Sequence, residues 1–481
     1  MMHRLRGLIG GGVAALCLGG AISHAQPLAT DDTQVVRYDG YALVRSVLLA
    51  PSDLAALESA GILMLSCEPS PNGVDLVVPP GAGRVLEAMG LESETLIDDI
   101  QPMIDAESAR IRDSLRRLAR GEGDWYDDYK PLSAIDERID ELIARRPDLV
   151  SRSVIGTTHE GRPIWMMRIS GETGGACKPG FLLNGLTHAR EWITPMNVMY
   201  LAERLVDDYG TDPEITAVVD QMEWFIIPVL NPDGYAFSWS TNRLWRKNRA
   251  PHPQIASRRG VDLNRNYSVD WGNDQGSSPE PYADLYRGLA PFSERETSAL
   301  RDFVLAHPNI RAHNDTHSAA ELILFPWGIR PAKIPEYYDY LLLGWEMEDL
   351  IHDAHGSEFR TGAVQDGLYR ISGGSTDWFY EVAGAWTYMY ELRGPTFDPD
   401  PSHIRPGAEE TFWATLLHAS RVIETTSFRA DLDADCDFDY DDVLAFLTAF
   451  VSGDPLADFD LNTEVDIADI LLFLQTFSED S

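Results

Sequence analysis

Cysteine is scarce in this chain, and its few copies are scattered. The 481 residues contain only four, Cys17, Cys67, Cys177 and Cys436, and none has the close spacing of a zinc ribbon. Loss of Cys17 with an N-terminal leader would leave three, each in a different region. This arrangement excludes a disulfide framework, so we expect core burial to hold most of the fold together.

Long apolar runs are absent after the first 22 residues. The one such run, roughly residues 8–22, follows Arg4 and Arg6 and precedes the small residues of Ser23-His24-Ala25. Its length and its glycines favour an export signal over a retained membrane anchor. We therefore predict a signal peptide at residues 1–25, no membrane span in the mature protein, and a secreted, extracellular product.

Basic residues are few, and the last part of the chain has none. The formal net charge is −37, and residues 431–481 contain 15 Asp and Glu but no Lys or Arg. Such acidity disfavours binding to nucleic acid or to anionic lipid. A generally acidic surface explains the charge of the earlier residues, but it does not explain the terminal cluster.

Residue patterning divides the mature chain into three modules. Residues 26–120 show a β-α-β-β-α-β order, with a hairpin signal at Pro71-Asn72-Gly73, followed by a charged helix. This order predicts a small ferredoxin-like α+β domain. Residues 121–428 alternate apolar strand candidates with helical stretches, which predicts an α/β domain. Residues 429–481 hold the acidic cluster. The strand candidates of the middle module are residues 164–169, 181–186, 224–230, 310–316 and 386–392.

His188 and Glu191 form a His-x-x-Glu pair directly after one of these strand candidates. In an extended strand, residues three apart lie roughly 10 Å from each other at about 3.3 Å per residue. A turn at the strand end brings them within about 7 Å, where they could bind one ion. A third ligand from another strand would leave a position open for water, as in catalytic zinc sites. The spacing alone is weak, because His355 and Glu358 repeat it in a polar stretch.

Further motifs follow this pair in a fixed order. They are Asn231-Pro-Asp-Gly-Tyr235, Trp245-Arg-Lys-Asn-Arg249, Gly260-Val-Asp-Leu-Asn-Arg-Asn266, His317-Ser318, Tyr369 ahead of Ser372-Gly-Gly-Ser-Thr-Asp-Trp378, and Tyr390-Glu-Leu-Arg393. Together they resemble the metallocarboxypeptidases of the carboxypeptidase A type. The resemblance implies an α/β/α fold around a mixed, mostly buried sheet. It also implies a zinc exopeptidase that hydrolyses the C-terminal peptide bond of peptides and proteins.

The resemblance implies which residues hold the zinc ion. His188, Glu191 and His317 match the zinc ligands. His313 competes with His317, because both lie on the same face of one strand candidate, but the pairing of His317 with Ser318 and its distance from Glu191 favour His317 and leave His313 a structural role. Asp262 is a candidate partner for the imidazole of His188.

The same resemblance implies the catalytic and substrate-binding residues. Glu391 matches the general base, and Arg246 matches the cation that stabilises the developing oxyanion. Without the motif, Glu391 would be interpreted as an ion-pair partner of Arg393. The residues that match substrate-binding positions are Arg190, Asn264, Arg265, Tyr369 and Thr376. Among them, Asn264 and Arg265 match the pair that holds the terminal carboxylate, a task that suits a guanidinium group.

A further set of residues matches the pocket for the terminal side chain. These are Leu324, Gly328, Val364, Leu368, Ile371, Thr376 and Met389. Thr376 stands where relatives that prefer basic residues carry an acidic one, and an apolar pocket disfavours a charged side chain. We therefore expect a preference for apolar or aromatic terminal residues. Met389 departs from the small polar residue often found there, and Arg370 places a charge beside Tyr369.

The position of the first module matches the activation segment of precursor carboxypeptidases. The resemblance implies that this segment covers the cleft until an activating protease cuts the connecting helix. Arg116, Arg117 and Arg120 are candidate cut sites, with the mature enzyme starting near Gly121. A binding domain unrelated to activation stays open as an alternative.

The acidic cluster is a repeat with a spacing of 27 residues. Oxygen-bearing side chains occupy loop positions 1, 3, 5, 9 and 12 of both copies, and each copy leads into an apolar helix. Because calcium takes six to eight oxygen ligands, we predict two calcium sites. Their ligands would be Asp431, Asp433, Asp435, Asp439, Asp442, Asp458, Asp460, Asn462, Asp466 and Asp469. The repeat resembles dockerin modules, which implies an α-helical, EF-hand-like fold and a cohesin-like or cell-surface partner. A calcium-stabilised end cap and a disordered acidic tail are the alternatives.

Two other functions also stay open. One is a related peptidase that acts on cell-wall peptides. The other is a catalytically inactive, surface-attached binding protein, which would lack a metal ligand or the base. No such residue is missing from the motifs above.

Overall fold

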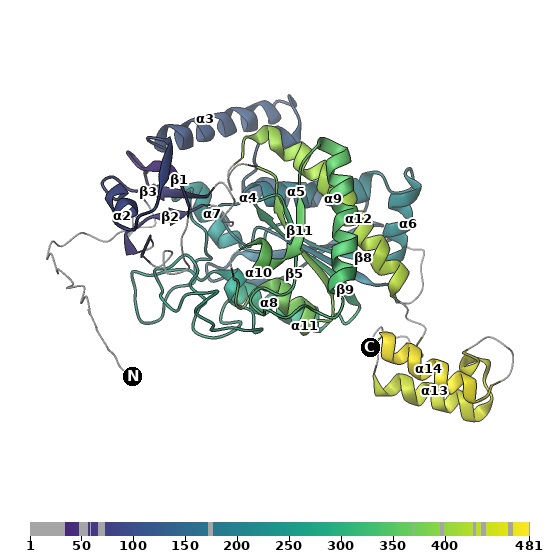
Figure 1. Ribbon diagram of the computed structural model, residues 1–481. Helices are drawn as coiled ribbons and strands as arrows, with labels where there is room; N and C mark the ends of the chain where they lie inside the picture. Colours follow the sequence, from purple (N-terminus) through teal and green to yellow (C-terminus); the bar gives the residue numbers. More distant parts are fainter. Residues whose placement is uncertain are drawn as a thin grey trace, which may run out of the picture.

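The computed structural model describes residues 34–47, 56–57, 59–65, 73–171, 177–368, 370–394, 399–426, 430–433, 439–459 and 465–480. These residues form three units in chain order (Figure 1). The helix α3 leads from the small N-terminal unit into the large central unit, and α13 and α14 form a separate lobe near the C-terminus. The predicted signal peptide at residues 1–25 lies outside the described residues.

The N-terminal unit contains an antiparallel sheet of four strands in the order β2-β3-β1-β4. Its elements are β1 (Ala42–Ser46), β2 (Leu63–Met64), β3 (Val74–Val78), α2 (Gly83–Ala88), β4 (Ser93–Ile97) and α3 (Gln101–Leu118). Every residue of β3 is buried, as expected for a central strand. Strands β2 and β3, which flank the predicted hairpin, pair antiparallel. Gly73, directly before β3, has a φ of 101°, a conformation that favours glycine, whereas Pro71 and Asn72 lie outside the described residues.

The central unit is built on a mixed sheet of eight strands in the order β11-β10-β12-β9-β7-β8-β6-β5. The strands are β5 (Val150–Thr157), β6 (Pro163–Ile169), β7 (Gly180–Gly185), β8 (Glu223–Ile227), β9 (Ile310–Ser318), β10 (Leu322–Phe325), β11 (Arg360–Ala363) and β12 (Trp386–Leu392). The four central strands, β8, β7, β9 and β12, run parallel, so their carboxyl ends meet at one edge. Glu391 of β12 lies opposite His317 of β9 in this register.

Helices surround this sheet (Figure 1). They are α4 (Leu132–Arg145), α5 (Ile193–Asp207), α6 (Pro213–Gln221), α7 (Pro232–Ser240), α8 (Arg295–Leu305), α9 (Tyr337–His355), α10 (Val364–Gly367), α11 (Ser375–Glu381) and α12 (Ile404–Thr425), with short 3-10 turns η1 (Trp125–Asp127), η2 (Leu263–Arg265) and η3 (Pro401–His403). Helix α12 packs against α5, α6 and α9, whereas α8 contacts β5 and α11 contacts β9 and β12. One continuous apolar core joins these layers, and in it Phe181 stacks on Trp224 at 4.8 Å.

The C-terminal unit consists of α13 (Tyr440–Ser452), the turn η4 (Pro455–Ala457) and α14 (Ile467–Asp480). Phe446, Phe459 and Phe473 form the centre of its own apolar core, with Phe446 stacked on Phe473 at 4.1 Å. The two repeats therefore pack their apolar helices against each other. This packing excludes a wholly disordered tail for the described residues.

Most predicted elements of the central unit are present, but the prediction omitted three strands. The strands at residues 164–169, 181–186, 224–230, 310–316 and 386–392 correspond to β6, β7, β8, β9 and β12. The omitted strands are β5, β10 and β11, of which β5 and β11 form the two sheet edges. Both edge strands carry exposed polar residues, so they lack the apolar run of a buried strand.

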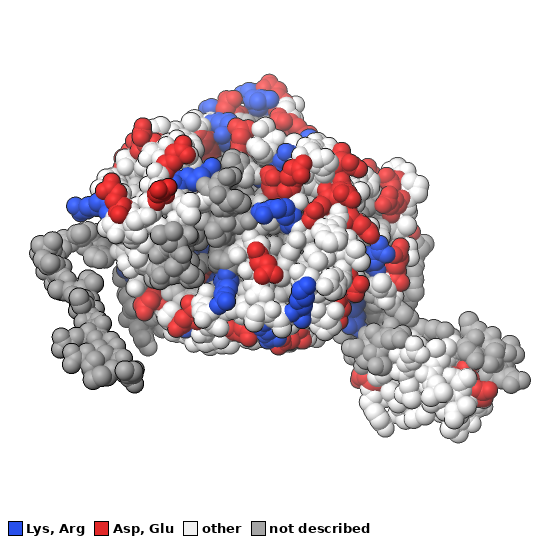
Figure 2. Space-filling model, viewed as in Figure 1, with Lys and Arg blue, Asp and Glu red and all other residues white. Residues whose placement is uncertain are grey.

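The acidic composition is visible on the surface. On the face shown in Figure 2, Asp and Glu side chains spread over much of the central unit, with Lys and Arg side chains between them. None of the described helices combines the length and the apolar character needed to cross a bilayer.

Candidate metal centre and active site

The end of β7 forms a tight turn that brings His188 and Glu191 together. Leu186 follows the strand with a φ of 55°, which is uncommon for a residue with a side chain. Thr194 holds this turn, because its hydroxyl accepts a hydrogen bond from the Leu186 amide and donates one to the Glu191 carbonyl. His188 Nδ1 consequently lies 2.8 Å from Glu191 Oε1. The turn predicted from the spacing is confirmed.

His317 completes a buried group of three residues that could hold a metal ion. It lies at the end of β9, with Nδ1 at 3.2 Å from Glu191 Oε2 and 3.0 Å from His188 Nδ1. One donor atom from each residue lies within 4.8 Å of the other two. Two imidazole nitrogens and one carboxylate form the donor set of catalytic zinc sites, which keep one position open for water.

Each of the two imidazoles contacts a buried carboxylate with its other ring nitrogen. His188 Nε2 lies 3.1 Å from Asp262 Oδ1, and His317 Nε2 lies 3.1 Å from Asp315 Oδ2. Such contacts keep the proton on Nε2 and leave Nδ1 available to a metal ion. Asp262 was predicted for this position. Asp315 was not, although its place two residues before His317 on the same strand face could have indicated it.

The charges of this centre are tightly coupled. Burial raises the pKa of Glu191, but His188 and His317 outweigh it and hold that pKa below its ordinary value. Burial lowers the pKa of His317, but Asp315 and Glu191 outweigh it and raise that pKa well above its ordinary value. A positive charge is therefore favoured between these side chains.

Glu391 lies beside this group on the neighbouring strand. Its side chain is buried, and Oε2 has no hydrogen-bond partner among the described residues. Burial, together with the nearby carboxylates of Glu191 and Asp315, raises its pKa to about 8, although His317 and Arg246 act in the opposite direction. The alternative of a Glu391–Arg393 ion pair is not observed, because Arg393 lies 3.3 Å from Glu410 instead.

The predicted cations also lie near the centre. Arg246 donates to Asp262 Oδ2 from Nε at 3.2 Å and from Nη2 at 3.0 Å, and its Nη1 lies 3.8 Å from Glu191 Oε1. Arg265 is buried in the turn η2. Burial raises the pKa of Asp262, but the charges of Arg246 and, to a smaller extent, Arg265 outweigh it and hold that pKa well below its ordinary value. Asn264 Nδ2 lies 3.4 Å from His317 Nε2.

An apolar cluster borders Asn264. It joins β10, β12 and the segment around α10, and consists of Leu322, Leu324, Val364, Leu368, Ile371 and Met389. Met389 Sδ lies 3.7 Å from Asn264 Nδ2, and Thr376 is buried at the start of α11. Five residues predicted for the terminal side-chain pocket are therefore gathered in one place. Tyr369 lies outside the described residues.

Arg190 contacts the N-terminal unit. Its Nη2 donates to the Met64 carbonyl of β2 at 2.9 Å, and its Nη1 lies 3.6 Å from Asp284. A buried ion pair between Arg243 and Glu107 of α3 lies close by, since Arg243 also donates to the Arg190 carbonyl. The N-terminal unit is thus bonded to the turn that carries His188 and Glu191.

Two other histidines that sequence analysis considered lie away from the centre. His313 contacts Thr387 and Asn184 and stacks on the ring of Phe379, so it has a structural position. Burial lowers its pKa to about 3, which keeps it neutral. His355 contacts Glu409 rather than Glu358, so the second His-x-x-Glu spacing forms no site.

The acidic repeat shows one bond pattern twice. Asp442 accepts from the amides of Leu432 and Asp439, and Asp469 accepts from those of Phe459 and Asp466, 27 residues later. Asp431, Asp433 and Asp442 could hold a metal ion. The predicted ligands Asp435, Asp460 and Asn462 lie outside the described residues.

One cysteine forms a bond that the sequence did not predict. Cys177 is disulfide-bonded, and its Sγ lies 2.9 Å from Asp431 Oδ2 of the C-terminal unit. Cys67 and Cys436 lie outside the described residues. Cys177 is the only cysteine among the described residues, and its disulfide was not anticipated when the scattered cysteines were expected to form no disulfide framework.

Comparisons with known proteins identify the family. The zinc carboxypeptidase family (Peptidase M14) matches residues 135–414. Carboxypeptidase A1 of Rattus norvegicus is 37% identical over 335 residues, which cover 69% of this chain and 79% of that protein. Carboxypeptidase A4 of Mus musculus is 34% identical over 371 residues, 75% of this chain and 87% of that protein.

Solved structures give the same result. Thrombin activatable fibrinolysis inhibitor has a TM-score of 0.72 at 25% identity, covering 81% of this chain and all of that one. Carboxypeptidase A from Helicoverpa armigera has a TM-score of 0.71 at 26% identity, covering 80% and 98%. The chain therefore belongs to the zinc carboxypeptidase family, and it is a metallocarboxypeptidase.

Proposed function

We propose that this chain is a secreted zinc carboxypeptidase, made as an inactive precursor, that releases apolar or aromatic residues from the C-termini of peptides and proteins. One observation carries the proposal. His188, Glu191 and His317 converge on one centre, and Glu391 lies next to it with an oxygen that makes no hydrogen bond among the described residues. A zinc ion held there would polarise the scissile carbonyl and lower the pKa of bound water to about 7.

Glu391 acts as the general base and acid. Its Oε2 accepts a proton from the attacking water and returns it to the leaving amine. Burial supports this role, because a carboxylate poised near neutral pH can both take and release a proton. Arg246 stabilises the negative charge that develops on the carbonyl oxygen, from a position that Asp262 fixes through two hydrogen bonds.

Asn264 and Arg265 hold the terminal carboxylate of the substrate, and Arg190 contacts the next residue inward. Two supports favour these roles. The guanidinium of Arg265 is buried in the same turn as Asn264, which restricts its orientation. The apolar cluster around Met389 adjoins Asn264, so an apolar side chain could lie there while the carboxylate is bound. Tyr369 would close over this residue.

The N-terminal unit inhibits the precursor. It occupies Arg190 through Met64, and Tyr38 donates to Asn242 at 2.7 Å beside Arg246. Because Arg190 is proposed to bind substrate, its contact with Met64 competes with substrate. The Arg243–Glu107 ion pair, buried on both sides, fixes α3 against the central unit.

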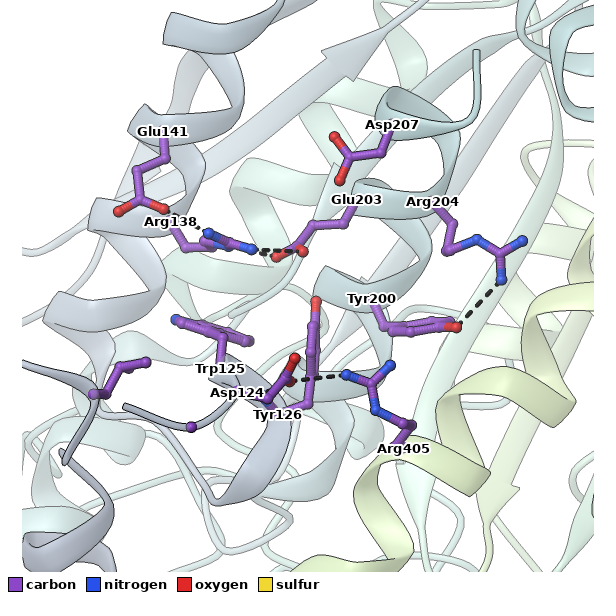
Figure 3. Close-up of a pocket in the computed structure, with 12 residues that line it drawn as sticks. Asp124, Trp125, Tyr126, Arg138, Glu141, Tyr200, Glu203, Arg204, Asp207 and Arg405 are labelled. Carbon is purple, nitrogen blue, oxygen red and sulfur yellow. Dashed lines mark hydrogen bonds and ion pairs between the residues drawn. The ribbon is translucent and has the colours of Figure 1, made fainter. Parts of the chain in front are cut away.

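Activation follows cleavage at the end of α3. Arg116, Arg117 and Arg120 are exposed there and are available to a trypsin-like protease. Just beyond them, residues 123–126 line a polar pocket of about 520 Å³ together with side chains of α4 and α5 (Figure 3). Asp124 caps η1 and binds Arg405 at 2.8 Å, which would keep the new N-terminus docked after the cut. This anchoring favours a mature enzyme that starts near Gly121.

The C-terminal unit binds two calcium ions and docks the enzyme to a cohesin-like or cell-surface partner. The equivalent roles of Asp442 and Asp469 support two similar loops, each closed by the last residue of its acidic repeat. Calcium would offset the mutual repulsion of the carboxylates. Residues 1–25 direct the chain to secretion.

Hydrolysis of blocked dipeptides tests the proposal. The precursor is treated with trypsin and assayed on substrates ending in Phe, Leu, Lys or Arg, with and without a zinc chelator. We expect activity only after trypsin, fastest release of Phe or Leu, and loss with the chelator. Fastest release of Lys would refute the preference, full activity before trypsin would refute inhibition, and cleavage of cell-wall peptides alone would favour the related peptidase. No cleavage of any substrate would favour a binding protein.

A further inference from the structure

A second cluster of metal-ligating side chains lies outside the active site. It joins His159, in the turn between β5 and β6, to Glu294 and Glu296 at the start of α8. One donor atom from each residue lies within 4.8 Å of the other two, and His159 Nε2 is 3.5 Å from Glu294 Oε2. Neither the catalytic nor the substrate-binding roles above use these residues.

The two carboxylates are buried and held in fixed positions. Glu294 is 5% exposed and Glu296 is fully buried. Asn248 Nδ2 donates to both, at 2.7 Å to Glu294 and 3.0 Å to Glu296. The amide cannot turn over, because Asn248 Oδ1 accepts from the amides of Val261 and Ala250. The carboxylates therefore remain next to each other.

Some donor atoms of this cluster have no hydrogen-bond partner. Glu296 Oε1 and His159 Nε2 are buried, and neither makes a hydrogen bond to any described residue. A buried polar atom without a partner is energetically unfavourable, and more so if it is charged.

Two arginines near the cluster make contacts outside it. Arg295 is turned to the Thr158 carbonyl, and Arg249 lies 3.4 Å from Glu160. A cavity of about 240 Å³ opens onto part of the cluster, and its lining includes His159, Glu294, His252, Arg258 and Arg259 but not Glu296. An ion in solution thus has a route to the donor atoms of His159 and Glu294.

We propose that His159, Glu294 and Glu296 form a second metal site, which binds a divalent transition-metal ion of the zinc type. One imidazole nitrogen with two carboxylate oxygens favours such an ion over calcium, which takes oxygen ligands. Asn248 orients the carboxylates, as outer hydrogen-bond partners do at other metal sites.

The site joins the β5–β6 turn, the start of α8 and, through Asn248, the segment before the turn η2. These segments support η2, which contains the proposed substrate-binding residues. Asn248 binds the amide of Val261, just before Asp262. Asn266, just after Arg265, accepts from the Glu294 amide at 3.2 Å and from the Thr297 hydroxyl at 2.7 Å. An ion at Glu294 and Glu296 would therefore fix the turn from both of its ends.

Metal stoichiometry tests the site without reference to activity. The full-length protein is equilibrated with Zn²⁺ in excess calcium, freed of unbound metal, and analysed for zinc by mass spectrometry. We expect two zinc equivalents in the wild type and one in His159→Gln and in Glu296→Gln. His352→Gln, which changes an exposed histidine outside the cluster, should keep two.

Two further measurements separate the possible outcomes. His317→Gln should lose the other equivalent together with activity, which distinguishes this site from the active site. If Glu296→Gln disrupts the fold, His159→Gln still tests the site, because it changes a surface turn. Circular dichroism checks that this variant is folded. A wild type with one equivalent, or a His159→Gln protein that keeps two, would overturn the proposal.

Discussion

Glu391 of β12 lies directly opposite His317 of β9, in register on adjacent parallel strands. The hydrogen-bonded ladder of the sheet, and not a loop, therefore sets the distance between Glu391, the proposed base, and His317, which could hold the metal ion. Ladder spacing varies little, so the sheet itself pre-organises the two groups.

Replacement of Glu391 should remove proton transfer and leave metal binding intact. We expect Glu391→Gln to lower kcat by about 10²–10⁴-fold, because a positioned general base contributes about that factor. The zinc content should equal that of the wild type. Steady-state kinetics and metal analysis of the trypsin-treated protein check this, with Glu409→Gln as the control. A kcat within a few-fold of wild type would show that another group acts as the base.

The carboxylates behind the imidazoles should determine metal affinity. Asp315→Asn and Asp262→Asn remove the negative charge from His317 and His188 but keep the size of the side chain. We expect each to weaken zinc binding by roughly 10–100-fold. Competition with a chelator measures the change, and Asp302→Asn, an exposed substitution, serves as the control. Unchanged affinity in both variants would mean that the two carboxylates do not tune the imidazoles.

Loss of the Arg243–Glu107 ion pair should loosen the precursor. Glu107→Gln leaves Arg243 buried beside a neutral side chain. Removal of one charge from a buried ion pair costs about 3–5 kcal/mol of stability. We expect higher activity of the uncut precursor and faster cutting by trypsin. Assays before and after a trypsin time course check both, with Glu87→Gln, an exposed change in α2, as the control. An equally inactive and equally resistant precursor would contradict the proposed lock.

Asp377 should make the free energy of unfolding depend on pH. Burial raises its folded-state pKa from 3.8 to about 7, although the Gly328 amide opposes this shift. Between these values the folded state holds the proton and the unfolded state does not, so the free energy of unfolding falls as pH rises from about 4 to about 7 and levels off above. We expect a fall of roughly 3 kcal/mol between pH 5 and pH 8 from this group.

Asp377→Asn isolates that contribution. The amide keeps an oxygen acceptor for the Gly328 amide but cannot ionise, so the variant should lack this part of the pH dependence. Urea unfolding of both proteins at pH 5 and pH 8 gives the difference. Identical pH dependence in wild type and variant would show that Asp377 has an ordinary pKa.

Calcium should stabilise the C-terminal unit. Addition of calcium to the chelated full-length protein should raise the melting temperature of this unit, because binding to the folded state alone stabilises it. Asp442→Asn should reduce the rise, since Asp442 closes the first acidic loop, whereas the exposed Asp441→Asn should not. Differential scanning calorimetry separates this transition from that of the central unit. No effect of calcium on the wild type would refute the calcium sites.

The metal centre could be predicted from the sequence because its parts are local signals. The apolar run before His188 and the strand that contains His317 are both visible as patterns, and the motif order links them. Asp315 was missed because a lone carboxylate in a strand has many possible roles.

The edge strands and the second cluster could not be predicted for a different reason. Strand β11 is short and polar, so only its pairing with β10 makes it a strand. His159 and Glu294 lie far apart in the sequence, and only the packing of α8 against β5 brings them together. Tertiary contacts of this kind leave no periodic signal.

Strand β12 has a consequence for how specificity can change. Glu391 and Met389 are two residues apart, so both side chains project from the same face, about 7 Å from each other along the strand. The proposed base and one wall of the side-chain pocket thus belong to the same rigid strand. Substitutions in α10 and β10 can widen or narrow the pocket, whereas any shift of Met389 along β12 would also displace Glu391.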